Sequence, residues 1–175
     1  NLITHSSKLH LSHVEFSLTP DQILGSGIFL EHDSDLYFED NTNAEISGFA
    51  AEEASGIYAE SYSEDGHGIW VTSSSLKVTD CGWYGMTIDP INLTLDNADV
   101  YFTGNGLYGY GGALGCYGVG SYGGTLTMIS STLTATNNPG GWYGYAVYAG
   151  VLDMDAASTL YATDSGGFGG GLGNS

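Results

Sequence analysis

Residues 92–105 read NLTLDNADVYFTGN, and this stretch contains two short apolar pairs on either side of a polar turn. In the first pair Leu93 and Leu95 flank a threonine, and in the second Val100 and Phe102 flank a tyrosine. Such alternation is typical of a strand with one face in a core and the other in solvent. The stretch therefore predicts two consecutive short strands joined by a tight corner.

The same pattern occurs six times, which predicts a solenoid of stacked coils. Successive units are separated by steps of 26, 41, 24, 33 and 26 residues, and a third short apolar segment, such as Met86 to Ile88, follows in several of them. We therefore expect an all-β fold, a parallel β-helix of about six coils that forms a single domain over residues 1–175. The first pair begins at Leu2, Ile28, Ile69, Leu93, Leu126 and Leu152, and the second at Leu9, Leu36, Leu76, Val100, Leu133 and Leu160.

The step of 41 residues predicts an insertion after coil two, between Asn41 and Gly68. Two alternatives stay open for this insertion, a loop that leaves the solenoid or an additional, less regular coil. The second strands are expected to align in one inward-facing stack, because they hold the same place in each unit. The members of that stack are Leu36, Leu76, Val100, Leu133 and Leu160.

An asparagine or aspartate follows each of five second strands within about three residues. These side chains bond to nearby backbone and tolerate left-handed backbone dihedrals, so they are expected to form the corners of the coils. The five residues are Asn41, Asp80, Asn105, Asn138 and Asp164.

The charge balance restricts the partners of the chain. Twenty Asp and Glu residues face two lysines and no arginine, which gives a formal net charge of −18. Nucleic-acid binding needs a basic surface that neutralises phosphates, so it is excluded as a function. Anionic lipids and acidic polysaccharides also need cationic partners. No catalytic motif stands out and no apolar run is long enough to span a membrane, so we expect neither an enzyme, nor a bound cofactor, nor membrane insertion.

The chain begins at Asn1 within the first coil and shows no leader segment. This is the pattern of a processed mature chain or of a fragment of a larger product, and it favours an extracellular or cell-surface location. The sequon Asn92-Leu93-Thr94 fits that location as a candidate N-glycosylation site.

The two cysteines, Cys81 and Cys116, lie about one coil apart in the expected register. Three states are open for them: an internal disulfide, an intermolecular disulfide, or two small buried thiols.

Acidic and histidine residues in the first two coils are candidate metal ligands. Glu31, Asp33 and Asp35 alternate along an expected strand, and their carboxylates offer the oxygen ligands that calcium prefers. A solvated acidic face is the competing interpretation. His10 alternates with Leu9 and Leu11, so its side chain is expected to point outward, and no complete metal-ligand set accompanies it.

Aromatic residues five to seven positions after the second strand predict a ladder along the solenoid. Its candidate members are Trp83, Tyr108, Trp142 and Phe168. The structural interpretation is stacking that fixes the register of the coils. The functional interpretation is a contact ladder that binds sugars or another subunit.

Short motifs in the chain resemble those of the polymorphic outer-membrane proteins and related surface β-helices. Phe38-Glu39-Asp40-Asn41 and Phe102-Thr103-Gly104-Asn105 match the FxxN motif, and Gly111-Gly112-Ala113-Leu114 follows the second like the GGA(I/L) motif. This resemblance implies a secreted, surface-displayed parallel β-helix used for adhesion or envelope structure. The blend of glycine, tyrosine and acidic residues also resembles the sheath and surface-layer proteins of some archaea.

We expect a self-assembling extracellular structural protein of a cell-surface layer, sheath or filament, with copies of itself as partners. The repeat runs from Leu2 to the final glycines without a capping element, and uncapped strand rows pair with other chains. The alternative is a surface adhesin or carbohydrate-binding β-helix module, whose aromatic ladder contacts glycans.

Overall fold

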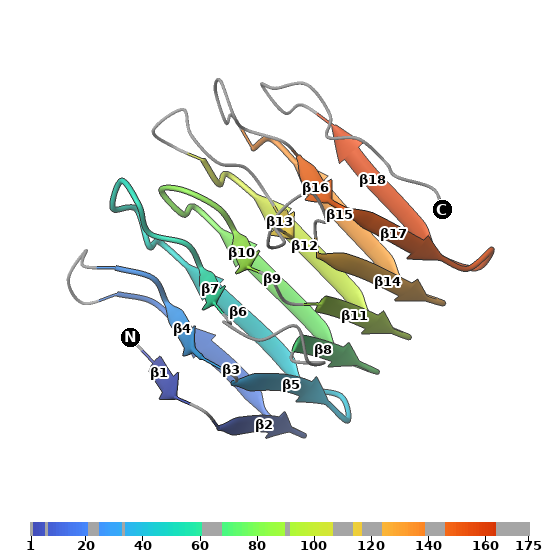
Figure 1. Cartoon of the computed structure of the whole chain (residues 1–175), viewed down its shortest axis with the longest axis horizontal. Coiled ribbons are helices and arrows are strands. Elements are labelled where there is room, and N and C mark those ends of the chain that lie inside the picture. Colours follow the sequence, from blue (N-terminus) through green and yellow to red (C-terminus); the bar gives the residue numbers. More distant parts are fainter. Residues whose placement is uncertain are drawn as a thin grey trace.

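The structure is a computed structural model that describes residues 2–5, 7–20, 25–32, 34–60, 68–89, 92–106, 114–116, 124–138 and 146–163. These residues form three parallel six-stranded sheets, and each coil contributes one strand to each sheet. The coils step from β1–β3 at the lower left of Figure 1 to β16–β18 at the upper right. The expected all-β parallel solenoid of six coils is confirmed.

The three sheets are named A, B and C in the order in which the chain enters them. Sheet A comprises β1 (Leu2–His5), β4 (Ile28–Glu31), β7 (Ile57–Glu60), β10 (Met86–Asp89), β13 (Leu114–Cys116) and β16 (Val147–Ala149). Sheet B comprises β2 (Lys8–Ser12), β5 (Asp35–Glu39), β8 (Gly68–Thr72), β11 (Asn92–Asp96), β14 (Thr125–Ile129) and β17 (Val151–Met154). Sheet C comprises β3 (Glu15–Leu18), β6 (Asn43–Ser47), β9 (Ser75–Thr79), β12 (Asp99–Thr103), β15 (Thr132–Thr136) and β18 (Thr159–Thr163).

The core is a continuous apolar column between the three sheets. In β11 Leu93 and Leu95 are fully buried while Asn92 is exposed, as the alternation predicts. The inward row of sheet B continues from coil to coil in register, so each leucine packs on the next. That row is Leu9, Leu36, Ile69, Leu93, Leu126 and Leu152. No helix among the described residues is long and apolar enough to span a membrane.

The predicted stack of second strands is wrong at its first member. Leu36 lies in β5 and pairs with Ile69 of sheet B, whereas Leu76 lies in β9 and pairs with Ala44 of sheet C. From Leu76 onward the prediction is confirmed, because Leu76, Val100, Leu133 and Leu160 are consecutive partners in sheet C. The register was shifted by one sheet in the first two coils.

The insertion predicted after coil two is also corrected. Strands β6 and β7 lie within that segment and are regular members of sheets C and A. Measured along sheet B from Leu9 to Leu152, the coils take 27, 33, 24, 33 and 26 residues. The apparent step of 41 residues arose because Ala44 and Ile46 of β6 are too weak a pair to stand out in the sequence.

The corners differ in length according to the sheets that they join. Between sheets B and C the chain needs two to four residues in every coil, whereas between sheets C and A it needs six to ten. Asn41 and Asp80 have positive φ values of 64° and 57°, as expected for corner residues. The next two predicted corner residues, Asn105 and Asn138, are instead fully buried, and Asp164 lies outside the described residues.

Asn105 and Asn138 form a buried amide ladder at the corner between sheets C and A. Asn105 Oδ1 accepts a hydrogen bond from the Cys81 backbone nitrogen at 3.1 Å, and Asn138 Oδ1 accepts from the Asn105 nitrogen at 3.0 Å. Asn105 Nδ2 donates to the Val78 carbonyl at 3.1 Å. The ladder therefore satisfies backbone groups that the corner removes from the sheet.

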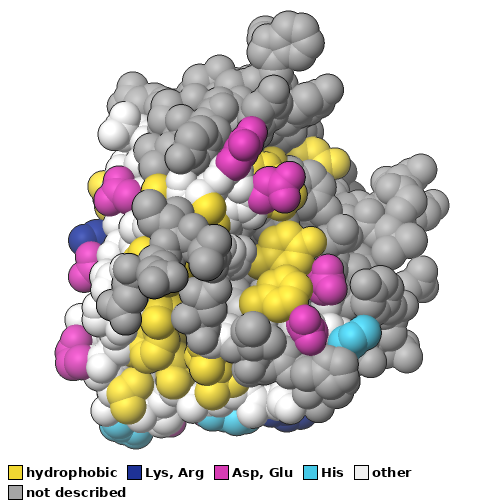
Figure 2. Space-filling view, turned by 90° about the vertical axis from the view of Figure 1, so that its left-hand side faces the viewer, with side chains coloured by type: hydrophobic (Ala, Val, Ile, Leu, Met, Phe, Trp, Pro, Cys, Tyr) yellow, Lys and Arg dark blue, Asp and Glu magenta, His cyan; other side chains and the backbone are white. Residues whose placement is uncertain are grey.

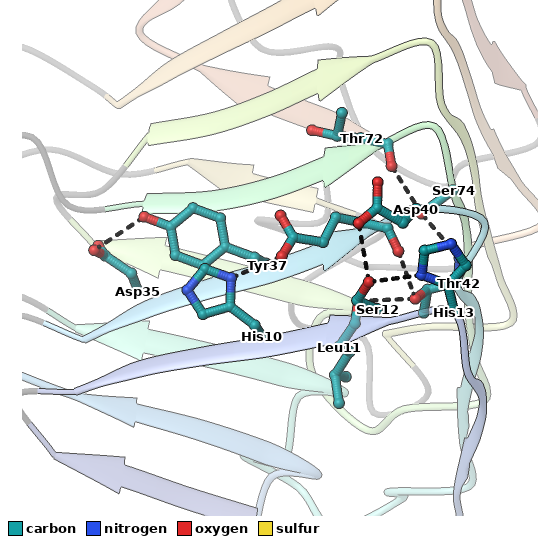
Figure 3. A network of polar contacts seen from close by, with 11 residues as sticks. His10, Leu11, Ser12, His13, Asp35, Tyr37, Asp40, Thr42, Thr72 and Ser74 are labelled. Atoms are coloured by element: carbon teal, nitrogen blue, oxygen red, sulfur yellow. Dashed lines mark hydrogen bonds and ion pairs between the residues drawn. The ribbon is translucent and has the colours of Figure 1, made fainter.

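The FxxN resemblance divides between two kinds of corner. Asn105 of the second motif belongs to the amide ladder, whereas Asn41 of the first motif lies exposed between sheets B and C. At that corner a buried serine takes the role of the asparagine. Ser74 Oγ accepts from the Thr42 nitrogen at 3.1 Å and donates to the Thr72 carbonyl at 2.8 Å (Figure 3).

Candidate functional site

Three aromatic side chains stack in parallel on the outer face of sheet B. The rings of His10 and Tyr37 lie 4.2 Å apart at 1°, and those of Tyr37 and Trp70 lie 4.6 Å apart at 8°. The strands place them together because His10 pairs with Tyr37, and Tyr37 pairs with Trp70, in consecutive coils. The prediction that His10 points outward is confirmed. We call these three residues the aromatic stack.

A glycine makes room for the last ring of the stack. Gly68 is two residues before Trp70 and therefore lies on the same face of β8. A Cβ atom at this position would lie 3.1 Å from Trp70 Cη2 and 2.6 Å from the Asn92 carbonyl oxygen. The absence of a side chain at Gly68 thus lets the indole lie along the sheet surface.

A nearly buried carboxylate supports the stack from below. Asp35, whose side chain is 5% exposed, forms an ion pair with Lys8 at 3.2 Å. It also accepts hydrogen bonds from the Gly68 nitrogen at 3.2 Å and from the Tyr37 hydroxyl at 3.3 Å. The hydrogen bond from Lys8 to Asp35 raises the pKa of the Lys8 ammonium above 10.5. Burial, followed by the charge of Asp35, raises the pKa of Tyr37 above 10.0.

A second polar group fixes His10 at the other end of the stack. His10 Nδ1 lies 2.8 Å from Glu39 Oε1, and the Ser12 hydroxyl donates to Asp40 Oδ2 at 2.9 Å. These contacts join coil one to coil two beside the stacked rings of His10 and Tyr37 (Figure 3). The stack is therefore held by ion pairs and hydrogen bonds as well as by its rings.

The stack ends at Trp70. The next residue in this row is Thr94, which pairs with Trp70 in register, and it is followed by Thr127 and Asp153. The Trp70 indole N–H and the Thr94 hydroxyl have no hydrogen-bond partner within the described ranges. The face of the indole that points toward coil four thus meets only small, polar side chains.

A second aromatic group lies on sheet A. Phe29 and Tyr58 lie 5.2 Å apart, Tyr58 and Trp83 lie 6.4 Å apart, and Trp83 lies 5.3 Å from the buried Tyr84. Trp83 is thus stacked on a neighbour, as the structural interpretation of the ladder expects. Tyr108, Trp142 and Phe168, the other candidate members of the contact ladder, lie outside the described residues.

The candidate calcium ligands are not brought together. Asp35 is engaged by Lys8, Tyr37 and Gly68, and Glu31 lies in β4 of sheet A rather than in the same strand. Asp33 falls outside the described residues. In the part of the chain that the structure describes, no group of three His, Cys, Asp or Glu side chains is arranged to hold a metal ion.

Cys81 is a free, fully buried thiol, so the internal disulfide to Cys116 is not formed. Cys81 lies in the corner after β9 and Cys116 in β13, and the side chain of Cys116 is outside the description. Burial raises the pKa of Cys81 to about 12, while hydrogen bonds from the backbone of Phe49 and Gly56 act in the opposite direction. The thiol therefore remains protonated and fills the end of the amide ladder.

The outer face of sheet C is divided into a charged and an uncharged part. Lys77 of β9 pairs with Glu45 of β6 at 2.9 Å, and this hydrogen bond raises the pKa of Lys77 above 10.5. In the next three coils the outward residues of the sheet are almost all hydroxyl-bearing. They are Asp99, Tyr101 and Thr103, then Thr132, Thr134 and Thr136, then Thr159, Tyr161 and Thr163. We call these nine residues the hydroxyl face.

Elsewhere the surface is strongly acidic. Figure 2 shows carboxylates scattered between hydrophobic patches on the side of the molecule that lies at the left of Figure 1, and few cationic groups. This distribution agrees with two lysines in the whole sequence.

The sequence analysis missed the aromatic stack because it depends on register. Tyr37 lies inside a pair that was assigned to the second strand, and Trp70 lies inside a pair that was assigned to the first. Both occupy the outward middle position of sheet B. Aligning the coils on this middle position would have revealed the row.

Comparisons with models of protein families, with curated protein sequences and with solved structures find no match to this chain. The arguments for function therefore rest on the geometry described above.

Proposed function

We propose that this chain is a self-assembling structural protein of an extracellular layer, sheath or filament, and that copies associate through the hydroxyl face. One observation carries the proposal. In a chain of net charge −18, the nine outward residues of the hydroxyl face include a single charged residue, Asp99. Copies repel one another over most of their surface, and this face is where the repulsion is weakest.

The side chains of the hydroxyl face suit contact with a second copy. Tyr101 is 38% exposed and Tyr161 is 55% exposed, and they lie on either side of Thr134 in one row. Tyrosine is enriched at protein interfaces because its ring is apolar and its hydroxyl finds hydrogen-bond partners. A flat sheet of hydroxyl groups and tyrosines can therefore pack against the same surface of another copy.

The size of the hydroxyl face predicts weak individual contacts. Three five-residue strands about 4.8 Å apart give a surface of about 14 Å by 17 Å. A standard protein interface buries roughly 800 Å² on each partner, which is about three times more. Assembly should therefore depend on protein concentration and on screening of the acidic surface by salt, which acts within about 8 Å at physiological ionic strength.

Light scattering against protein concentration, at low salt, at high salt and with divalent cations, tests the proposal. We expect particle size to grow with concentration and with salt. Tyr161→Glu should abolish this growth, because it places a new charge in the hydroxyl face. Ser17→Glu is the matched control, since Ser17 is exposed on β3 and lies in sheet C outside the hydroxyl face.

Two outcomes would contradict the proposal. A wild-type protein that remains monomeric under every condition would exclude self-assembly. Equal loss of assembly in Tyr161→Glu and Ser17→Glu would show that total charge matters and that the hydroxyl face does not.

A further inference from the structure

We propose that the face of Trp70 that points toward coil four is a binding subsite for a neutral pyranose ring. The inference goes beyond self-assembly and concerns a different sheet from the hydroxyl face. It also concerns a different set of aromatic residues from the ladder expected from the sequence. The ligand is a hexose or N-acetylhexosamine unit of a glycan.

The indole offers one open face. Tyr37 covers the face of Trp70 toward coil two at 4.6 Å. On the side of coil four the register places Thr94 opposite Trp70 and Asn92 opposite Gly68, and neither residue carries a ring. The C–H face of a pyranose is apolar and packs on aromatic rings, which present negative charge density on their faces.

The ring is already held in one orientation. It is stacked on Tyr37 at 8°, and Tyr37 is itself fixed by stacking on His10 and by its hydrogen bond to Asp35. Gly68 leaves the space into which the indole lies. A ligand therefore binds without ordering a flexible side chain, which lowers the entropic cost of binding.

Unpaired polar groups surround the open face. The Trp70 N–H and the Thr94 hydroxyl have no partner among the residues that are described, so both can bond to sugar hydroxyl groups. Asn92 is exposed, and its Oδ1 accepts from the Thr125 nitrogen at 3.2 Å. The Asn92 amide N–H groups remain directed to other partners. One apolar platform with a few convergent polar groups is the usual composition of a small-molecule site.

Charge selects a neutral sugar. Both lysines of the chain are engaged in ion pairs, Lys8 with Asp35 and Lys77 with Glu45, and the sequence has no arginine. Asp96 follows Thr94 on the outer face of β11 and would repel a uronic or sialic acid. The subsite thus discriminates against acidic sugars.

Two sources can supply the same ring. One is a free oligosaccharide, and the other is a glycan linked to Asn92, because the sequon Asn92-Leu93-Thr94 places both polar residues on the outer face of β11 beside Trp70. The two sources predict different experiments, so both arms are needed.

The first arm uses protein from a bacterial cytoplasm, which carries no N-linked glycan. Chitotetraose, cellotetraose and mannotetraose are titrated while the indole N–H resonances are followed by NMR. A free-glycan subsite predicts a saturable shift of the Trp70 resonance, and at least tenfold weaker binding in Trp70→Ala. Trp83→Phe is the matched control and should bind as wild type does, because Trp83 lies beside sheet A.

The second arm uses protein secreted from an N-glycosylating host. A linked glycan predicts a mass increase at Asn92 that is absent in Asn92→Gln, together with nuclear Overhauser contacts between the first sugar and the Trp70 indole. Saturable binding in the first arm or sugar contacts in the second supports the subsite and identifies its source. Absence of both, or binding that persists unchanged in a folded Trp70→Ala protein, overturns it.

Discussion

The outer row of sheet B changes character halfway along the solenoid, although the core beneath it does not change. In coils one to three the row is His10, Tyr37 and Trp70, and in coils four to six it is Thr94, Thr127 and Asp153. The inward rows of the same strands are aliphatic or aromatic throughout. The repeat therefore specifies the core of each coil, while the outward positions are free to form different surfaces.

The largest effects should be the same in both halves, because they arise in the core. Phe38 and Phe102 are both fully buried, one in β5 and the other in β12. We expect Phe38→Ala and Phe102→Ala each to lower the free energy of unfolding by about 3–5 kcal/mol through the cavity that the ring leaves. Urea unfolding followed by circular dichroism measures both. An effect below 1 kcal/mol in only one half would contradict a uniform core.

The amide ladder should have the next largest effect and distinguishes the later coils. Asn105→Ala removes the acceptor of the Cys81 nitrogen and the donor to the Val78 carbonyl, both in a buried corner. The expected cost is about 2–3 kcal/mol, because buried polar groups lose their partners. Urea unfolding again provides the measurement.

Cys81→Asn is the control for this ladder, because asparagine has nearly the same volume as cysteine and extends the row of amides. It should leave the free energy of unfolding within about 1 kcal/mol of wild type. A loss as large as that of Asn105→Ala would show that the ladder does not accept a third amide.

The support of the aromatic stack should have a smaller effect, confined to the first three coils. Asp35→Ala leaves the Gly68 nitrogen and the Tyr37 hydroxyl without their acceptor, and we expect a loss of about 1–2 kcal/mol. Lys8→Ala should cost much less, since the Lys8 side chain is largely exposed. Near-ultraviolet circular dichroism should also lose the signal of the stacked rings in Asp35→Ala. Equal losses in the two variants would show that the ion pair, rather than the buried acceptor, supports the stack.

The smallest effect is a dependence on pH at the last corner between sheets B and C. The Ser158 hydroxyl donates to Asp155 at 2.6 Å, and this bond, followed by the bond from the Ser130 nitrogen, lowers the pKa of Asp155 below 3.8. Because the folded pKa is depressed, the stabilisation is present above the ordinary carboxyl pKa and is lost as pH falls through the lower folded value. Thermal unfolding from pH 6 to pH 2 should show a small advantage of wild type over Asp155→Asn that disappears at the acid end. A constant difference across this range would contradict the assignment.

The sequence predicted the later coils well because their strands carry large residues at both inward positions. Leu93 with Leu95 and Val100 with Phe102 are unambiguous pairs, and they define sheets B and C correctly. In coil two the third strand has Ala44 at an inward position, so it was missed and the register moved by one sheet. A small inward residue buries little apolar area and leaves little trace in the alternation.

The aromatic stack and the amide ladder depend on contacts between coils, which alternation along one strand does not report. Tyr37 and Trp70 are 33 residues apart and become neighbours only through the register of β5 and β8. Asn105 was predicted as a corner residue, yet its burial follows from the amide of Asn138 in the next coil. Spacing within a coil thus defines the fold, and spacing between coils defines the sites.

The unequal corners determine where this solenoid can accommodate foreign sequence. The short corners between sheets B and C contain buried serines that bond to the next coil, so added residues there would separate the coils. The corners between sheets C and A already vary from six to ten residues while the strands on either side remain paired. Peptide epitopes inserted into the latter corners should therefore be displayed along one edge of the solenoid at regular intervals of about 4.8 Å per coil.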